Sequence, residues 1–154
     1  MKKCAVTGTF DPLTFGHIEL VDKACDFFNE IVVLMLVNPE KKAVYSVEKR
    51  LEVLKEYFKD YKKVSVDFYD GYAVDYCKKH NIECLIRGVR NGVDYEYETF
   101  MAEENFKLGQ IPTMFFYSDS KEISSTKARE KLQNMLSAKE YLPESVEKIL
   151  KTKE

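Results

Sequence analysis

Two kinds of hydrophobic pattern alternate along the chain. Short apolar runs rich in β-branched and aromatic residues are typical of buried strands, whereas apolar residues at every third or fourth position are typical of amphipathic helices. The short runs predict strands at residues 4–7, 31–37, 64–68, 84–86 and 113–117. The longer patterns predict helices at residues 18–28, 47–58, 74–79 and 95–108.

The repeated order of strand, helix and strand predicts the fold class. Right-handed crossovers between such elements give a doubly wound, Rossmann-like α/β fold with a five-stranded parallel sheet and C-terminal helices. Ser124 or Ser125 is expected to cap a helix that continues to about Leu136, and Pro143 is expected in the first turn of a last short helix. Ligands bind such sheets beyond the carboxyl ends of the strands, so the segments after the strands are the candidate site.

Composition and charge narrow the class of protein. The 154 residues, 45% hydrophobic and 32% charged, fit a single domain spanning 1–154. A net charge of -2 supplies no broad positive field, so we expect no nucleic-acid partner. We also expect no membrane association, because no apolar run has the length of a membrane span and the first residues do not resemble a signal peptide. Four cysteines without a C-x-x-C pair favour a cytoplasmic location.

The segment 8–17 follows the first predicted strand and leads directly into a helical pattern. Glycine lets the backbone approach a ligand closely, and a helix start offers free N–H groups to an anion, so this segment predicts a phosphate site. It matches neither the dinucleotide fingerprint nor the P-loop. His17 stands at the helix start, where its ring can donate to a phosphate oxygen. The other histidine, His80, is expected to be a surface residue.

Positively charged side chains follow two further strands. Arg87 and Arg90 flank Gly88 beyond the fourth strand, where a guanidinium can bind phosphate through several donors. Lys41 follows the second strand, and its position supports either a functional role or solvated surface. We interpret Lys42 as a solvated surface residue.

Acidic and hydroxyl residues lie at two predicted helix starts. Asp94, Glu96 and Glu98 could be taken for a metal cluster, but acids in a first turn also interact favourably with the helix dipole, and we expect no tight metal site. The run 124–126 can cap a helix and bind phosphate at the same time, because both roles use the same N-terminus.

Together these motifs resemble one enzyme family. Residues 14–17 are similar to the [HT]-x-G-H signature of the nucleotidyltransferase superfamily that includes class I aminoacyl-tRNA synthetases. Residues 8–12 and 123–126 are similar to the same superfamily. The blocks 85–90, 94–98 and 101–105 resemble, more specifically, the bacterial phosphopantetheine adenylyltransferase family, and the match extends from Cys4 to about Pro143. The resemblance implies in-line attack of the phosphate of 4′-phosphopantetheine on the α-phosphate of ATP, giving dephospho-coenzyme A and pyrophosphate. A general base is not expected, since a phosphate monoester with a second pKa of about 6 is already mostly dianionic.

The resemblance also implies roles for individual residues. The implied catalytic residues are His17, Lys41 and Arg90. The implied ATP-binding residues are Thr9, Phe10, His17, Arg87, Gly88, Arg90, Asp94, Glu98, Ser124, Ser125 and Thr126. The implied acceptor-binding residues are Thr9, Lys41, Tyr72, Ala73, Arg87, Asn105 and Glu130. Glu98 is expected near the ribose and Asp94 is expected to support the arginines, while the stretch 118–122 departs from the family pattern in being shorter.

Cofactors and partners follow from the same resemblance. It implies Mg²⁺ held mainly by the phosphates of ATP, a homohexamer, and coenzyme A as a feedback ligand. A nicotinate or nicotinamide mononucleotide adenylyltransferase is the alternative, because 123–126 with Arg129 resembles that group too; the block 90–105 favours pantetheine. A non-catalytic nucleotide-binding domain is disfavoured by the presence of His17 and the basic residues.

Overall fold

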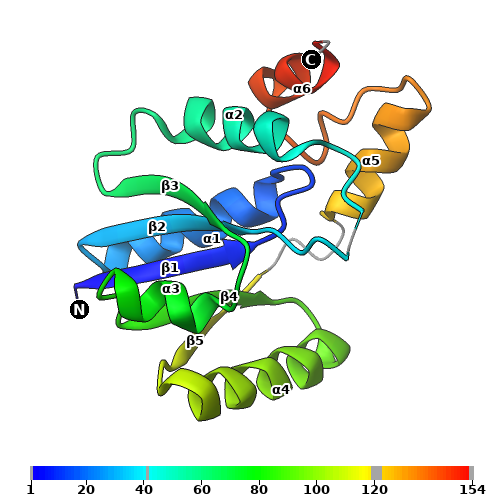
Figure 1. Ribbon diagram of the computed structural model, residues 1–154. Helices are drawn as coiled ribbons and strands as arrows, with labels where there is room; N and C mark the ends of the chain where they lie inside the picture. The colour runs from blue at the N-terminus through cyan, green and yellow to red at the C-terminus, as the bar shows by residue number, and fades with distance from the viewer. Residues whose placement is uncertain (1, 41, 119–122, 153–154) are drawn as a thin grey trace.

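The computed structural model describes residues 2–40, 42–118 and 123–152. Within them, five strands form one parallel sheet in the order β3-β2-β1-β4-β5, which confirms the predicted fold class (Figure 1). The strands are β1 (Lys3–Gly8), β2 (Glu30–Leu36), β3 (Val64–Tyr69), β4 (Cys84–Val89) and β5 (Thr113–Tyr117). The strand order reverses between β1 and β4, which pair directly from Cys4↔Cys84 to Val6↔Ile86. The ligand crevice of such a sheet lies at the carboxyl ends of these two strands.

Helices cover both faces of the sheet. They are α1 (Phe15–Phe27), α2 (Val47–Phe58), α3 (Ala73–Lys79), α4 (Gly92–Gly109), α5 (Ser125–Gln133) and α6 (Glu144–Lys151). Alternate residues of a strand point to opposite faces. Val6 of β1 therefore joins a core with Val21 of α1 and Val53 of α2, while its neighbour Ala5 packs in a second core with Tyr76 of α3. Figure 1 shows α2 and α6 on one side of the sheet and α4 on the other.

The ends of three helices differ from the prediction. α5 ends at Gln133 rather than at about Leu136, because Met135 adopts a φ of 59°, a left-handed conformation that cannot continue the helix. Pro143 is the N-cap of α6 and thus precedes its first turn. α4 begins earlier than predicted because the side chain of Asn91 caps it, accepting the backbone N–H of Asp94 at 2.9 Å.

The cysteines are free thiols, and Cys4, Cys77 and Cys84 are buried in the core. Burial, followed by the neighbouring thiols, raises the pKa of Cys4 to about 12, so this side chain stays neutral and serves packing. In the part of the chain that the structure describes, no helix combines the length and the apolar character that crossing a membrane requires.

Candidate active site

The turn after β1 lies beside the end of β4, where the strand order reverses. This adjacency brings the 8–17 segment close to Arg87 and Arg90, although they are far apart in the sequence. The first residues of α5 join the same region, because the hydroxyl of Ser125 donates to the carbonyl of Pro12 at 2.9 Å. The three segments that the sequence predicted separately therefore form one site.

His17 is held in a fixed orientation at the start of α1. Its Nδ1 accepts the backbone N–H of Thr14 at 3.0 Å and lies 3.2 Å from the Thr14 hydroxyl. The ring packs against Phe10, with 4.8 Å between the two ring centroids. Because Nδ1 accepts a hydrogen bond, the proton of the neutral imidazole lies on Nε2. His17 can therefore donate through Nε2 to an oxygen of a ligand.

The protonation state of His17 is set by its surroundings. Burial, reinforced by the charges of Arg87 and Arg90, lowers the pKa of His17 to about 4. The ring is consequently neutral at physiological pH. Its contribution to an anion site is a directed hydrogen bond, and the full positive charge comes from the two arginines.

Arg87 is bound on two sides by the protein. Its Nε and Nη2 each donate to a different oxygen of Glu98 at 2.8 Å, and its Nη1 donates to the carbonyl of Thr7 at 2.6 Å. Burial opposes the charge of Arg87, but the hydrogen bonds to Glu98 and the nearby acidic groups together outweigh it, so the pKa of the guanidinium is raised. Glu98 is itself buried. The pair fixes the Arg87 side chain, which projects from the second half of β4.

Arg90 is positioned by the start of α4 and by the segment before α5. Its Nε donates to Asp94 at 3.1 Å, and its Nη1 donates to the carbonyl of Ile123 at 3.0 Å. Asp94 thus supports an arginine, as the family resemblance implies. Glu96 is exposed and takes no part in these contacts.

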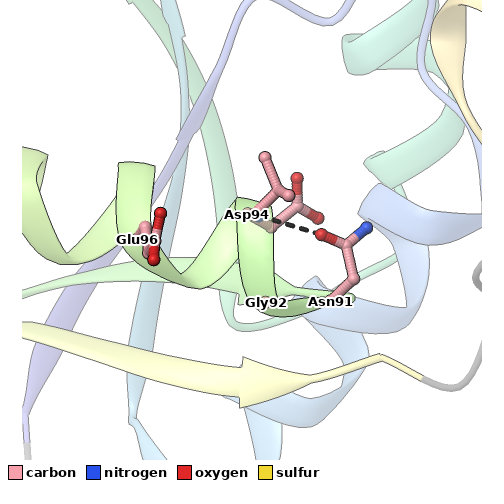
Figure 2. Close-up of a pocket in the computed structure, with 5 residues that line it drawn as sticks. Asn91, Gly92, Asp94 and Glu96 are labelled. Carbon is pink, nitrogen blue, oxygen red and sulfur yellow. Dashed lines mark hydrogen bonds between the residues drawn. The ribbon is translucent and has the colours of Figure 1, made fainter.

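An open pocket lies against the first turns of α4, next to Asp94 (Figure 2). It is lined by Asn91, Gly92, Val93, Asp94 and Glu96. Figure 2 shows Asn91 and Asp94 side by side at the helix start, with Glu96 further along α4. All of these residues come from one helix end, and the lining includes neither His17 nor the two arginines. The pocket is thus separate from the group formed by His17 and the two arginines, although Asp94 of its lining binds Arg90.

The start of α5 is tied to the turn after β1. The Ser124 hydroxyl caps the helix by accepting the backbone N–H of Lys127 at 3.1 Å, which confirms Ser124 as the capping residue. Arg129, one turn further on, donates through Nη1 to the carbonyl of Asp11 at 2.6 Å and through Nη2 to Thr126 at 3.2 Å. A helix N-terminus of this kind offers N–H groups to an anion.

The predicted acceptor residues are more widely spread. Thr9 is exposed in the turn after β1, whereas Tyr72 caps α3 and is 67% exposed. Ala73 begins α3, Asn105 lies on α4 and Glu130 is exposed on α5. Among the described residues, no hydrogen bond or ion pair joins these side chains to His17, Arg87 or Arg90. Lys41 and residues 119–122 lie outside the described residues.

Two charged residues that sequence reasoning did not single out are buried beside the site. Asp11 is 8% exposed and Arg50, near the start of α2, is 5% exposed. Fully buried charges are rare unless they are paired or hydrogen-bonded, and their partners here are largely backbone groups. Asp11 belongs to the segment that predicted the phosphate site, but the residue pattern carried no signal for Arg50.

Comparisons with known proteins identify the family of the chain. The profile of the cytidylyltransferase-like family matches residues 5–131. The phosphopantetheine adenylyltransferase of Christiangramia forsetii is 39% identical over 150 residues, covering 96% of this chain and 99% of that protein. The proteins of the same name from Caldanaerobacter subterraneus subsp. tengcongensis and Thermobifida fusca are 37% and 33% identical, covering 95% and 99% of this chain and 93% and 94% of those proteins.

Proposed function

Because the chain belongs to the cytidylyltransferase-like family and, within it, to the phosphopantetheine adenylyltransferases, we propose that it transfers the adenylyl group of ATP to 4′-phosphopantetheine. The products are dephospho-coenzyme A and pyrophosphate, and the reaction belongs to coenzyme A biosynthesis. The observation that carries the proposal is the neutral His17, oriented by Thr14, at the point where the ends of β1 and β4 meet.

The acceptor phosphate attacks the α-phosphate of ATP in line, and the residues of the site favour the transition state. The attacking phosphate is already mostly ionised near neutral pH, since its second pKa is about 6. The obstacle is repulsion between two anions, which calls for donors and positive charge at fixed positions. His17 supplies a donor through Nε2 to the α-phosphate. Arg90 and Arg87 supply the charge, with Lys41 on the acceptor side.

The remaining nucleotide contacts come from the surrounding segments. The proposed ATP-binding set adds Thr9, Phe10, Gly88, Asp94, Glu98, Ser124, Ser125 and Thr126 to the residues just named. The start of α5 favours this proposal, because Ser124 already caps it and Ser125 fixes it to Pro12. Free N–H groups in such a first turn can donate hydrogen bonds to the departing pyrophosphate and so stabilise its negative charge.

Mg²⁺ is proposed to enter as part of the substrate MgATP. Two acidic side chains of the site, Asp94 and Glu98, form ion pairs with Arg90 and Arg87, respectively. Among the described residues, no group of three or more His, Cys, Asp or Glu could hold a metal ion. In this proposal the phosphates of ATP supply most of the ligands of the ion, which would neutralise part of their charge.

The acceptor arm is proposed to run past Tyr72, Ala73, Asn105 and Glu130, with its phosphate on Thr9, Lys41 and Arg87. Coenzyme A carries both a pantetheine arm and an adenosine part, so it is the natural feedback ligand for this site. A cytoplasmic location is proposed with this metabolic role.

The proposed assembly is a homohexamer. Large apolar side chains on α4 face solvent in the single chain, among them Val93 (79% exposed), Tyr97 (59%) and Phe100 (57%). Exposed apolar clusters of this kind commonly mark protein interfaces, and a closed symmetric assembly would cover them.

An acceptor panel tests the function. ATP, Mg²⁺ and each candidate acceptor are incubated with the protein, and pyrophosphate release is measured. Phosphopantetheine is expected to exceed nicotinate or nicotinamide mononucleotide in kcat/KM by at least roughly a thousandfold, since the wrong acceptor leaves several polar groups unpaired. Comparable turnover of a mononucleotide would refute the acceptor assignment, and no pyrophosphate release with any acceptor would refute catalysis.

A further inference from the structure

Asp11 joins the turn after β1 to the segment before α2. Its Oδ2 accepts the backbone N–H of Val44 at 2.9 Å, and its Oδ1 accepts that of Tyr45 at 3.0 Å. The backbone carbonyl of Asp11 also receives the hydrogen bond from Arg129 of α5. A buried aspartate whose carboxylate accepts two hydrogen bonds and whose backbone carbonyl accepts a third fixes the relative positions of the segments that provide the donors.

Arg50 binds the same two segments as a donor, whereas the carboxylate of Asp11 binds as an acceptor. Its Nε donates to the carbonyl of Tyr45 at 3.0 Å, with the carbonyl of Ser46 at 3.4 Å, and its Nη1 donates to the carbonyl of Thr9 at 3.0 Å. The planar guanidinium can reach both segments at once, which a single ammonium group cannot do with the same geometry.

Together, these contacts form a closed ring of hydrogen bonds. The backbone N–H of Tyr45 donates to Asp11, and the backbone carbonyl of Tyr45 accepts from Arg50. Arg50 also donates to the carbonyl of Thr9, and Thr9 precedes Asp11 by two residues, which closes the ring. The ring thus ties the segment 42–46 to the turn that carries Thr9. The arginines on the ATP side have separate supports, because Glu98 and Asp94 of α4 hold Arg87 and Arg90.

We propose that Asp11 and Arg50 are positioning residues for the acceptor phosphate, because their ring fixes Thr9 and the segment 42–46 relative to each other. The inference rests on the proposed function, in which Thr9 and Lys41 bind that phosphate; Lys41 directly precedes the segment in the chain. Loss of the ring should therefore weaken use of the acceptor more than use of ATP.

Lys49 provides a matched control for Arg50. It is the preceding residue of α2, is 6% exposed, and donates through Nζ to the carbonyls of Ile149 and Thr152, each at 3.2 Å. Lys49 therefore binds α6, while Arg50 binds the turn at the site. Arg50→Gln and Lys49→Gln each remove a buried cation that binds backbone carbonyls, but only the first opens the ring.

The experiment measures the melting temperature and both KM values by pyrophosphate release. Arg50→Gln should raise KM for phosphopantetheine by about tenfold or more and change KM for ATP by less than about threefold. Lys49→Gln should lower the melting temperature while leaving both KM values near wild type. Equal changes in both KM values for Arg50→Gln, no change in either, or the same acceptor defect in Lys49→Gln would overturn the inference.

Two milder variants keep the test decisive if Arg50→Gln does not fold. Arg50→Lys keeps the positive charge but loses the planar guanidinium with its several donors. Asp11→Asn leaves one of two backbone N–H groups without an acceptor. Both variants should show a smaller defect in the use of the acceptor. Absence of an acceptor defect in both would contradict the proposal. The wild-type acceptor panel separates the two ideas: a different preferred acceptor refutes the proposed function, and the KM comparison is then made with that acceptor.

Discussion

The guanidinium of Arg87 and the carboxylate of Glu98 meet through two hydrogen bonds of 2.8 Å each. Two parallel hydrogen bonds fix the orientation of the guanidinium as well as its distance from the carboxylate. Because Glu98 is buried on α4 and Arg87 lies within β4, the pair also couples a helix to the sheet at the site. The position of the positive charge is therefore set before any ligand arrives.

Glu98→Gln tests this pair. The amide retains one acceptor oxygen but turns an NH₂ group toward Arg87, so one hydrogen bond is lost and Arg87 becomes less constrained. We expect kcat/KM to fall by about tenfold to a hundredfold, with a lower melting temperature. Glu96→Gln, at an exposed position on the same helix, should leave both quantities near wild type. Normal kinetics in Glu98→Gln would show that the pair contributes nothing to the reaction.

His17→Ala should slow turnover far more than it weakens substrate binding. The Nε2 donor is expected to count most as charge shifts in the transition state, so we expect kcat to fall on the order of a hundredfold or more. Steady-state kinetics and ATP titration provide the two measurements. His80→Ala is the control, since His80 stacks on Tyr76 away from the site residues. Near-normal turnover in His17→Ala would remove this residue from the mechanism.

The lowered pKa of His17 predicts a pH dependence of stability. Burial and the two arginines hold the pKa at about 4 in the folded chain, whereas the ordinary value is 6.5. Between these values the unfolded chain binds a proton that the folded chain does not, so the free energy of unfolding falls as the pH drops from 6.5 toward 4. The effect is on the order of 1–3 kcal/mol.

Urea unfolding at about pH 7 and about pH 4.5 measures this contribution. His17→Gln should lose less stability between the two conditions than wild type, because the titrating group is gone. A His17→Gln protein with the full wild-type pH dependence would disprove the assignment.

Lys41→Ala and Arg90→Ala should have opposite effects on the two substrates. Lys41 is proposed to face the acceptor phosphate and Arg90 the nucleotide. The first variant should raise KM for phosphopantetheine more than KM for ATP, and the second should do the reverse. Equal changes in both constants for both variants would refute this division of roles.

The proposed hexamer predicts sedimentation near six times the chain mass of 18.0 kDa. Phe100→Glu should shift the protein toward smaller species, because it places a charge among the exposed apolar side chains of α4. Analytical ultracentrifugation at micromolar concentration distinguishes the states. A wild-type monomer that does not associate with increasing concentration would contradict the assembly.

The strands were predictable because buried strands leave continuous apolar runs in the sequence. β5 has the predicted bounds of 113–117. β4 was predicted to end at Ile86 because Arg87 and Gly88 break the apolar run, yet both continue the ladder, opposite Phe115 and Phe116. Hydrogen bonding to a neighbouring strand does not depend on side-chain polarity, so the pattern underestimated this strand.

The site was predictable where residue type signals chemistry. His17, Arg87 and Arg90 were identified from their places after strands, and the structure gathers them where β1 and β4 end. The ring through Asp11 and Arg50 was missed because its partners are backbone groups: Val44 is 33 residues from Asp11, and Thr9 is 41 residues from Arg50. Backbone partners leave no trace in residue identity. The prediction for Lys41 stays a prediction, since it lies outside the described residues.

The pairing of β1 with β4 has a consequence for protein synthesis. Residue 4 meets residue 84 across these strands, whereas β1, β2 and β3 are complete before β4 is translated. A nascent chain that stops before β4 contains His17 but neither arginine of the site. Pairings between such distant segments form late, because they close long loops. The proposed nucleotide site therefore cannot assemble on the ribosome until β4 has been translated and has paired with β1.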